Sequence, residues 1–117
     1  MKPIRYSGIV EHGSQRGALL GFPTANIALT DEEVFGIYAA RVSVGEKKYH
    51  AAVFADTKRK LLEAHLLDFF GNLYGEEITI ELCEKIREGK MFANDDELEA
   101  AIAKDVEDVR HYFKDHP

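Results

Sequence analysis

Glu63 is a carboxylate in an otherwise apolar part of the chain, where Leu61, Leu62, Ala64 and Leu66 surround it. Charged side chains are rarely buried unless they are paired, so Glu63 either faces a wet pocket or belongs to a buried ion pair. Either environment raises the chance of a functional role. The residue alone leaves both interpretations open, with a structural ion pair as plausible as catalysis.

Thr24 and Asn26 are a second candidate, because they stand two residues apart in the segment Pro23-Thr24-Ala25-Asn26. In an extended backbone, such residues point to the same side, which brings a hydroxyl and an amide oxygen together. Two neutral oxygens can hold a Mg²⁺ ion whose other ligands are phosphates and water. For an isolated tetrapeptide, an ordinary turn with a capping threonine is the favoured alternative.

A glycine-rich stretch precedes this pair, with Gly13, Gly17 and Gly21 between His12 and Ile27. Glycines let a backbone approach a ligand closely, and loops of this kind commonly bind phosphates. The stretch lacks the Gly-Lys-Ser/Thr of a P-loop, and it does not follow the strand, turn and helix pattern of a dinucleotide site. By composition alone, a surface turn is the more frequent explanation.

Other chemistries lack support in the sequence. His65 shares the face of Glu63, but no other histidine has metal-ligand spacing relative to it, which argues against a zinc site. The single cysteine, Cys83, excludes an intrachain disulfide, and we expect a small buried thiol in a reducing compartment. A net charge of −6, without a basic run interleaved with aromatic residues, argues against nucleic acid as a partner.

The elements that position these residues are mainly strands. Alternating apolar and polar residues predict strands at 36–45 and 77–82, and a more continuously apolar run predicts a third at 61–69. The segments 49–54 and 6–10 are shorter candidates. In 36–45, Tyr38, Ala40, Val42 and Val44 form the apolar face of a half-buried strand. Short strands without helices between them favour an antiparallel barrel or sandwich.

The end of the chain changes to a helical period. Apolar residues recur at three- and four-residue intervals at Leu98, Ile102, Val106, Val109 and Phe113, which predicts an amphipathic helix. Asn94 and Glu97 form a capping pair before it.

The chain length of 117 residues predicts a single domain over 1–117. Without an apolar run of about 20 residues or a secretory signal, we expect a cytoplasmic monomer without membrane contacts.

Taken together, these segments resemble the riboflavin kinase family over about residues 6 to 113. The resemblance is carried by Gly13 to Gly17, Leu20-Gly21-Phe22-Pro23-Thr24-Ala25-Asn26, Gly36-Ile37-Tyr38, Leu62 to Phe69, Leu73-Tyr74-Gly75, and Ile86-Arg87 through Phe92. It implies a six-stranded antiparallel Greek-key barrel with a C-terminal helix. It also implies Mg²⁺-dependent transfer of the ATP γ-phosphoryl group to riboflavin, giving FMN and ADP.

The resemblance assigns roles residue by residue. Glu63 matches the catalytic carboxylate and would act as general base, while Thr24 and Asn26 match the positions that hold Mg²⁺ and phosphates. The positions that match the family's nucleotide-binding residues are Gly13, Gly17, Leu66, Asp68 and Tyr74. The positions that match the segment closing over the flavin are Arg87, Lys90, Phe92 and Glu97. Because the chain begins at the kinase part, the expected product is FMN only.

Two departures from the family pattern concern the phosphates. Ala18 stands where the family usually has a basic residue, and the turn at 54–60 is short and basic, with Lys58, Arg59 and Lys60. These residues either replace the missing charge or form a solvated turn. The alternative function is a flavin- or nucleotide-binding barrel with weakened catalysis.

Overall fold

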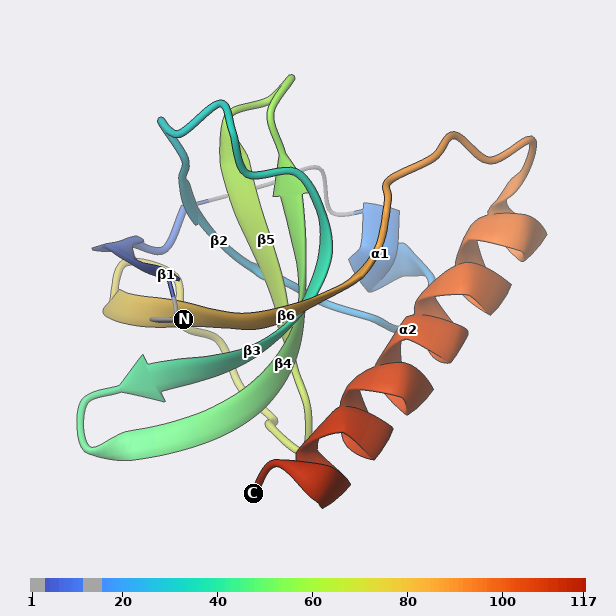
Figure 1. Cartoon of the computed structure of the whole chain (residues 1–117). Coiled ribbons are helices and arrows are strands. Elements are labelled where there is room, and N and C mark those ends of the chain that lie inside the picture. The colour runs from blue at the N-terminus through green and yellow to red at the C-terminus, as the bar shows by residue number, and fades with distance from the viewer. Residues whose placement is uncertain (1–3, 12–15) are drawn as a thin grey trace.

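The computed structural model consists of six strands and two helices, and it describes residues 4–11 and 16–117. The strands are β1 (Ile4–Ile9), β2 (Ala25–Ala28), β3 (Gly36–Val44), β4 (Lys47–Asp56), β5 (Leu61–Leu66) and β6 (Glu77–Arg87). The helices are the single turn α1 (Arg16–Leu19) and the long C-terminal α2 (Asp95–Asp115) (Figure 1).

The strands form one antiparallel sheet in the order β1-β6-β3-β4-β5-β2. Strands β3, β4 and β5 follow one another directly and β6 returns beside β3, which is the Greek-key arrangement. The outer strands meet where the Glu11 N–H donates to the Asn26 carbonyl at 2.7 Å. Gly8 permits this approach, since a Cβ there would lie 3.1 Å from Ile27 Cβ. The sheet is therefore a nearly closed barrel, as predicted.

The barrel interior is filled by one face of every long strand. Its fully buried members include Ile27, Val42, Val53, Leu62 and Ile80. The predicted apolar face of β3 belongs to this cluster, and the alternation in 78–82 places its isoleucines inward. Side chains of the opposite parity on these strands point out of the barrel.

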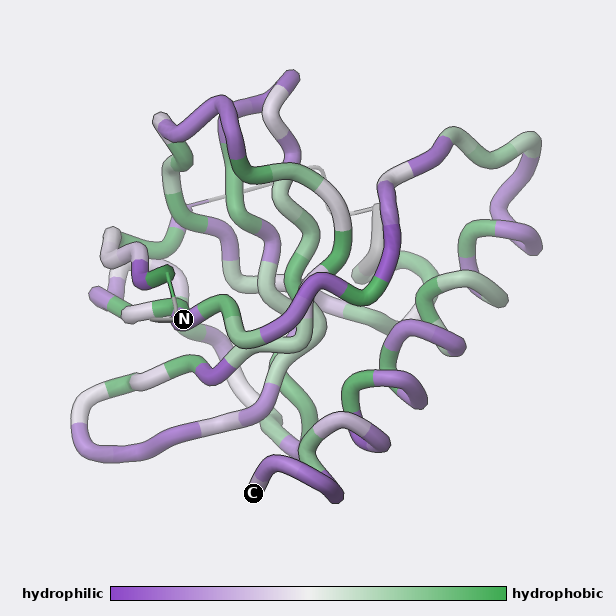
Figure 2. The backbone as a smooth tube through the Cα atoms, in the orientation of Figure 1, coloured by the Kyte–Doolittle hydropathy of each residue, from purple (hydrophilic) through white to green (hydrophobic). Residues whose placement is uncertain are grey.

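The outer face of the sheet is also covered, because α2 packs against it. Val109 and Phe113 of α2 are buried against Ala39 and Ala52, whose small side chains let the helix come close. Strand β3 is therefore buried on both faces near α2, and the prediction of a half-buried strand is wrong there. Figure 2 shows the alternation of apolar and polar residues along α2. Among the described residues, no helix is long and apolar enough to span a membrane.

The start of α2 follows the predicted capping pattern. Asn94 Oδ1 accepts a hydrogen bond from the Glu97 N–H at 2.9 Å, and Glu97 Oε2 accepts one from the Ala93 N–H at 3.0 Å. Asp95 and Asp96 add negative charge where the helix dipole is positive. These contacts define where the chain turns back along the barrel after the excursion that follows β6 (Figure 1).

One predicted strand is too long. Strand β5 ends at Leu66, whereas the apolar composition predicted a strand to Phe69. Asp68 has a φ of 57°, in the left-handed region, so the backbone leaves the strand direction there. Leu67 then joins the α2 cluster and Phe69 packs edge-on against Tyr49. The continuous apolar run at 61–69 therefore serves two packing environments, the barrel core and the cluster under α2.

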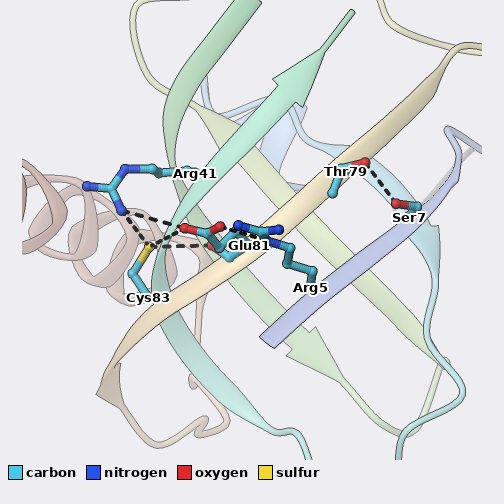
Figure 3. Close-up of polar contacts among 6 residues, drawn as sticks. All are labelled: Arg5, Ser7, Arg41, Thr79, Glu81 and Cys83. Atoms are coloured by element: carbon cyan, nitrogen blue, oxygen red, sulfur yellow. Dashed lines mark hydrogen bonds and ion pairs between the residues drawn. The ribbon is translucent and has the colours of Figure 1, made fainter. Parts of the chain in front are cut away.

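A polar cluster joins β1, β6 and β3 on their outer face (Figure 3). Glu81 lies between two arginines in the strand register, with Arg5 Nε at 2.8 Å and Arg41 Nη1 at 3.7 Å from its carboxylate. The Arg41 guanidinium also donates to Cys83 Sγ at 3.4 Å. Cys83 is only half-buried, against the prediction, and burial raises the pKa of its thiol. A thiol with a raised pKa is a weak nucleophile, which fits a packing role.

Candidate active site

A row of outward-facing side chains crosses five strands in direct register. Asn26 on β2 is opposite Glu63 on β5, and Glu63 is opposite Phe54 on β4. Phe54 is opposite Ile37 on β3, which is opposite Arg87 at the end of β6. Residues directly opposite one another in antiparallel strands project to the same side. The row therefore has polar groups at both ends and two apolar side chains in the middle.

Four members of this row form the floor of a cavity of about 390 Å³ between the sheet and α2. Glu63, Phe54, Ile37 and Arg87 all line it. The opposite wall is formed by the segment 89–92 and by Leu98 and Ile102 from the first half of α2. The two ends of α2 thus have different roles, because its second half packs on the sheet while its first half stands over a cavity.

Glycine at position 36 brings β3 close to the end of β6 beside this cavity. Gly36 has a φ of 101°, and a Cβ there would lie 2.7 Å from the Arg87 carbonyl oxygen. Any other residue would be strained and would push the two strands apart. The glycine therefore supports the position from which Arg87 leaves the sheet.

Glu63 has an environment that favours its protonated form. Burial raises the pKa of its carboxyl, and the neighbouring carboxylate of Asp56 raises it further, while the Arg59 guanidinium acts in the opposite direction. Asp56 is diagonal to Glu63 in the β4–β5 register, a relation that corresponds to about 7–8 Å between Cα atoms. A half-buried carboxylate with a raised pKa in a cavity is suited to proton transfer.

The neighbouring Asn26 and Thr24 fit a magnesium site. Thr24 lines the cavity, and Asn26 is only 3% exposed. Asn26 Oδ1 is buried and has no hydrogen-bond partner among the described residues. Such an oxygen is costly to bury unless something else binds it. No group of three acidic, histidine or cysteine ligands occurs in the described part of the chain, so a cation at this position would rely on neutral oxygens and its substrate.

The cavity wall near α2 depends on a residue that the sequence analysis did not identify. Asp105 is 4% exposed and binds Arg87 in a bidentate ion pair, with Nε–Oδ1 at 2.7 Å and Nη2–Oδ2 at 2.8 Å. Arg87 also donates to the Glu88 carbonyl at 2.9 Å and lies 5.8 Å from the Phe92 ring centroid. Asp105 is three residues after Ile102, on the apolar face of α2, and this position is the signal that could have revealed it.

Of the residues assigned by resemblance, Thr24, Glu63, Arg87, Lys90 and Phe92 line this cavity. Lys90 Nζ lies 5.3 Å from the Phe92 ring centroid. His65, which also lines the cavity, donates from Nδ1 to the Pro23 carbonyl at 2.8 Å, because a carbonyl oxygen can only accept. This bond connects β5 to the segment that carries Thr24.

Other assigned residues lie elsewhere. Leu66 points into the barrel core, and Asp68 forms two 3.1 Å hydrogen bonds with Arg110 of α2. Tyr74 is 55% exposed, and its N–H donates to Asn72 Oδ1. Glu97 caps α2 and does not line the cavity.

The glycine-rich stretch is described only in part. Gly13 lies outside the described residues, whereas Gly17 belongs to the helical turn α1, so the backbone there is not the loop that we expected. The structure therefore gathers the proposed base, one proposed metal ligand and three of the four flavin-side residues around one cavity, with Asn26 next to it. It does not bring the nucleotide-side residues Leu66, Asp68 and Tyr74 to that cavity.

The arrangement suits a ligand with an apolar body and a polar end. Phe54 and Ile37 offer an apolar floor, and the carboxylate of Glu63 adjoins it. A proton acceptor beside a site for metal-bound phosphates could activate a hydroxyl group of such a ligand.

Comparisons with known proteins agree with this geometry. A family model described as "Flavokinase: Riboflavin kinase" matches residues 1–113. The bifunctional riboflavin kinase/FMN adenylyltransferase of Haemophilus influenzae is 39% identical over 121 residues, which cover 96% of this chain and 39% of that protein. The chain thus spans about two fifths of the length of such relatives.

Solved structures show the same fold. The riboflavin kinase of Trypanosoma brucei superposes with a TM-score of 0.69 and 28% identity, covering 97% of this chain and 82% of that one. A structure described as a macrolide-efflux protein from Streptococcus pneumoniae gives a TM-score of 0.79 and 30% identity, covering 92% and 38%. On the match of the family model to nearly its whole length, this chain belongs to the riboflavin kinase family.

Proposed function

We propose that this chain transfers the γ-phosphoryl group of ATP to the terminal ribityl hydroxyl of riboflavin, giving FMN and ADP. Family membership supports the reaction class. The observation that carries the proposal is the position of Glu63, next to Phe54 in the row on the cavity floor and opposite Asn26. This places a proton acceptor between an apolar surface and a candidate phosphate site.

The flavin fits the apolar part of the cavity. Its ring system would lie over Phe54 and Ile37, with Phe92 and Lys90 on the opposite wall. The ribityl chain would then extend toward Glu63. Binding the ring at a distance from the reacting hydroxyl orients that hydroxyl, which is the main contribution a protein can make to phosphoryl transfer.

In the proposed step, the hydroxyl oxygen of riboflavin forms a bond to the γ-phosphorus of ATP. The bond between that phosphorus and the β,γ-bridging oxygen breaks, and ADP leaves with the electron pair. The hydroxyl proton passes to the Glu63 carboxylate. A positioned base of this kind contributes roughly 10²- to 10⁴-fold to the rate.

Thr24 and Asn26 would hold the metal ion on the phosphate side of Glu63. When bound, Mg²⁺ neutralises charge on the phosphate oxygens. The unpartnered Oδ1 of Asn26 supports this assignment, because an oxygen ligand that is buried in advance needs no rearrangement to bind.

The test is conversion of riboflavin to FMN by the purified chain with Mg-ATP, followed by chromatography. We expect stoichiometric FMN and ADP, and no FMN when Mg²⁺ is removed with a chelator. Tight riboflavin binding without FMN formation would contradict the proposal and would indicate a flavin-binding barrel that lacks catalysis.

A further inference from the structure

Among the described residues, three lysine and arginine side chains line the cavity, and they differ in how far their charge is already neutralised. Arg87 is bound in a bidentate pair by the buried Asp105. Lys90 belongs to the wall segment 89–92, close to Phe92 and away from the floor strands. Within the described residues, Arg59 has an ion pair with Asp56, in which its Nε lies 3.9 Å from Asp56 Oδ2. That separation is too long for a hydrogen bond, so the guanidinium donors remain able to bind another anion.

Arg59 is also the basic residue that the fold places next to Glu63. Its backbone N–H donates to Asp56 Oδ1 at 3.1 Å. This hydrogen bond closes the β4–β5 turn and fixes the position of the Arg59 backbone. Asp56 lies diagonally across from Glu63 on the same outward face. The opposite effects of Arg59 and Asp56 on the pKa of Glu63 agree with this proximity. Among the described side chains, Arg59 is therefore the cation available beside the proposed base.

The chemistry of the step identifies what that cation can bind. If Glu63 accepts the proton of the attacking hydroxyl, the γ-phosphoryl group must lie next to that hydroxyl, within the same end of the cavity. Negative charge is spread over the three equatorial oxygens of the group during transfer. A planar guanidinium can donate two parallel hydrogen bonds to such oxygens, which a lysine cannot do.

We propose that Arg59 binds the γ-phosphoryl oxygens of the nucleotide beside Glu63, with Asp56 as the residue that positions it. This inference rests on the proposed kinase function. It separates Arg59 from its neighbours in the basic turn, because Lys58 and Lys60 do not line the cavity. It also gives the chain a phosphate-binding cation from the β4–β5 turn, where the glycine-rich segment has Ala18.

The test compares the binding of two nucleotides that differ in the γ-phosphate. Calorimetry with Mg-AMP-PNP and Mg-ADP needs no turnover, and Arg59→Ala should weaken Mg-AMP-PNP about 10- to 100-fold, since hydrogen bonds to charged groups are the stronger kind. The loss for Mg-ADP should be less than about threefold. Arg59→Lys should recover part of the affinity but not all of it.

Lys58→Ala is the matched control, because it removes one positive charge from the same turn. We expect it to leave both nucleotide affinities within about twofold. The side chain of Arg59 is 57% exposed and its backbone bond to Asp56 survives substitution, so Arg59→Ala should keep the thermal midpoint.

Equal weakening of both nucleotides, or an effect of Lys58→Ala as large as that of Arg59→Ala, would overturn the assignment. So would unchanged Mg-AMP-PNP binding in a folded Arg59→Ala variant. If the wild-type chain forms FMN and one of these results is found, only the Arg59 assignment fails. If the wild-type chain forms no FMN, the proposed function fails, and the comparison of nucleotides still tests Arg59.

Discussion

Two polar residues that face each other across β2 and β5 are buried in different ways. Asn26 is neutral, and its buried Oδ1 has no partner among the described residues. Glu63 is ionisable, and burial together with Asp56 raises the pKa of its carboxyl. Both arrangements cost folding free energy, the first about 1–3 kcal/mol. Such costs concentrate where a structure is prepared to bind a ligand or transfer a proton.

Substitution of Asn26 should separate the two substrates. Asn26→Ala removes the buried oxygen that would bind the metal, so we expect Mg-ATP affinity to fall about tenfold or more, as for a lost bond to a charged group. Riboflavin affinity should change less than about twofold, because the flavin ring would lie over other residues. Calorimetry with each ligand measures both effects. Equal loss of both affinities would count against a metal-binding role.

Glu63 should reduce stability at neutral pH. The folded-state pKa of its carboxyl is raised above the ordinary value of 4.5. The contribution of Glu63 to the free energy of unfolding is therefore most favourable below pH 4.5, where the carboxyl is protonated, and this contribution is lost as the pH rises through the folded-state pKa. Glu63→Gln imitates the protonated form. We expect its thermal midpoint to equal or exceed that of the wild type at neutral pH, with the difference shrinking as the pH falls toward the ordinary value.

Thermal melts of the two proteins across this pH range provide the measurement. A midpoint that drops sharply in Glu63→Gln at neutral pH would support the other interpretation of this residue, a structural ion pair. Retained or increased stability combined with lost activity is the pattern expected for a functional carboxylate.

At the scale of elements, α2 is held by different forces along its length. Val109 and Phe113 are buried on the sheet near its end, while Asp105 binds Arg87 at its middle. Nearer its start, Leu98 and Ile102 line the cavity. The ion pair with Arg87 therefore lies at the boundary between the packed and the cavity-lining parts of the helix.

Breaking that ion pair should loosen the cavity wall. Asp105→Asn leaves Arg87 with a neutral partner, and we expect a loss of about 1–3 kcal/mol in unfolding free energy together with weaker riboflavin binding. Asp108→Asn is the control on the same helix, since its pair with Lys104 at 3.3 Å is exposed and should contribute less than about 1 kcal/mol. Equal effects of the two substitutions would contradict a special role for Asp105.

The elements themselves follow closely from sequence pattern. Alternation in β3 and β6 and the helical period of α2 are properties of neighbouring residues, so they can be read without knowing the topology. The row from Asn26 to Arg87 joins residues 61 positions apart through five strands, and its register depends on how the strands pair. The sequence analysis did not identify Asp105, although it lies on the apolar face of α2, and its partner could be found only from the folded chain.

Strand β5 shows why composition misled at one point. Leu66 and Leu67 are both buried, yet the first lies inside the barrel and the second packs under α2. Because each of these neighbouring residues is buried in a different apolar environment, the sequence shows no polar residue between them. The end of the strand at Leu66 is therefore not marked by a change in the apolar pattern. Leu66 and Asp68 do not line the cavity beside Glu63, so the nucleotide-binding roles that family resemblance suggests for them stay predictions.

For the whole molecule, the barrel and α2 act together. The barrel core gives a rigid floor for the row of site residues, and α2 closes the outer face that carries this row. Because α2 buries apolar residues against the sheet, we propose that residues 1–117 form one domain. The cavity then lies at the contact between the two layers, where a few side chains from each can reach one ligand.

The most direct test of the proposed chemistry is the turnover of Glu63→Gln with Mg-ATP and riboflavin, measured together with riboflavin affinity and thermal stability. If Glu63 is the general base, kcat should fall about 100-fold or more, while the riboflavin dissociation constant stays within about twofold of the wild type and the fold is retained. Near-normal turnover in the folded variant would show that the proton of the ribityl hydroxyl leaves by another route, and would contradict the role of Glu63 as the catalytic base.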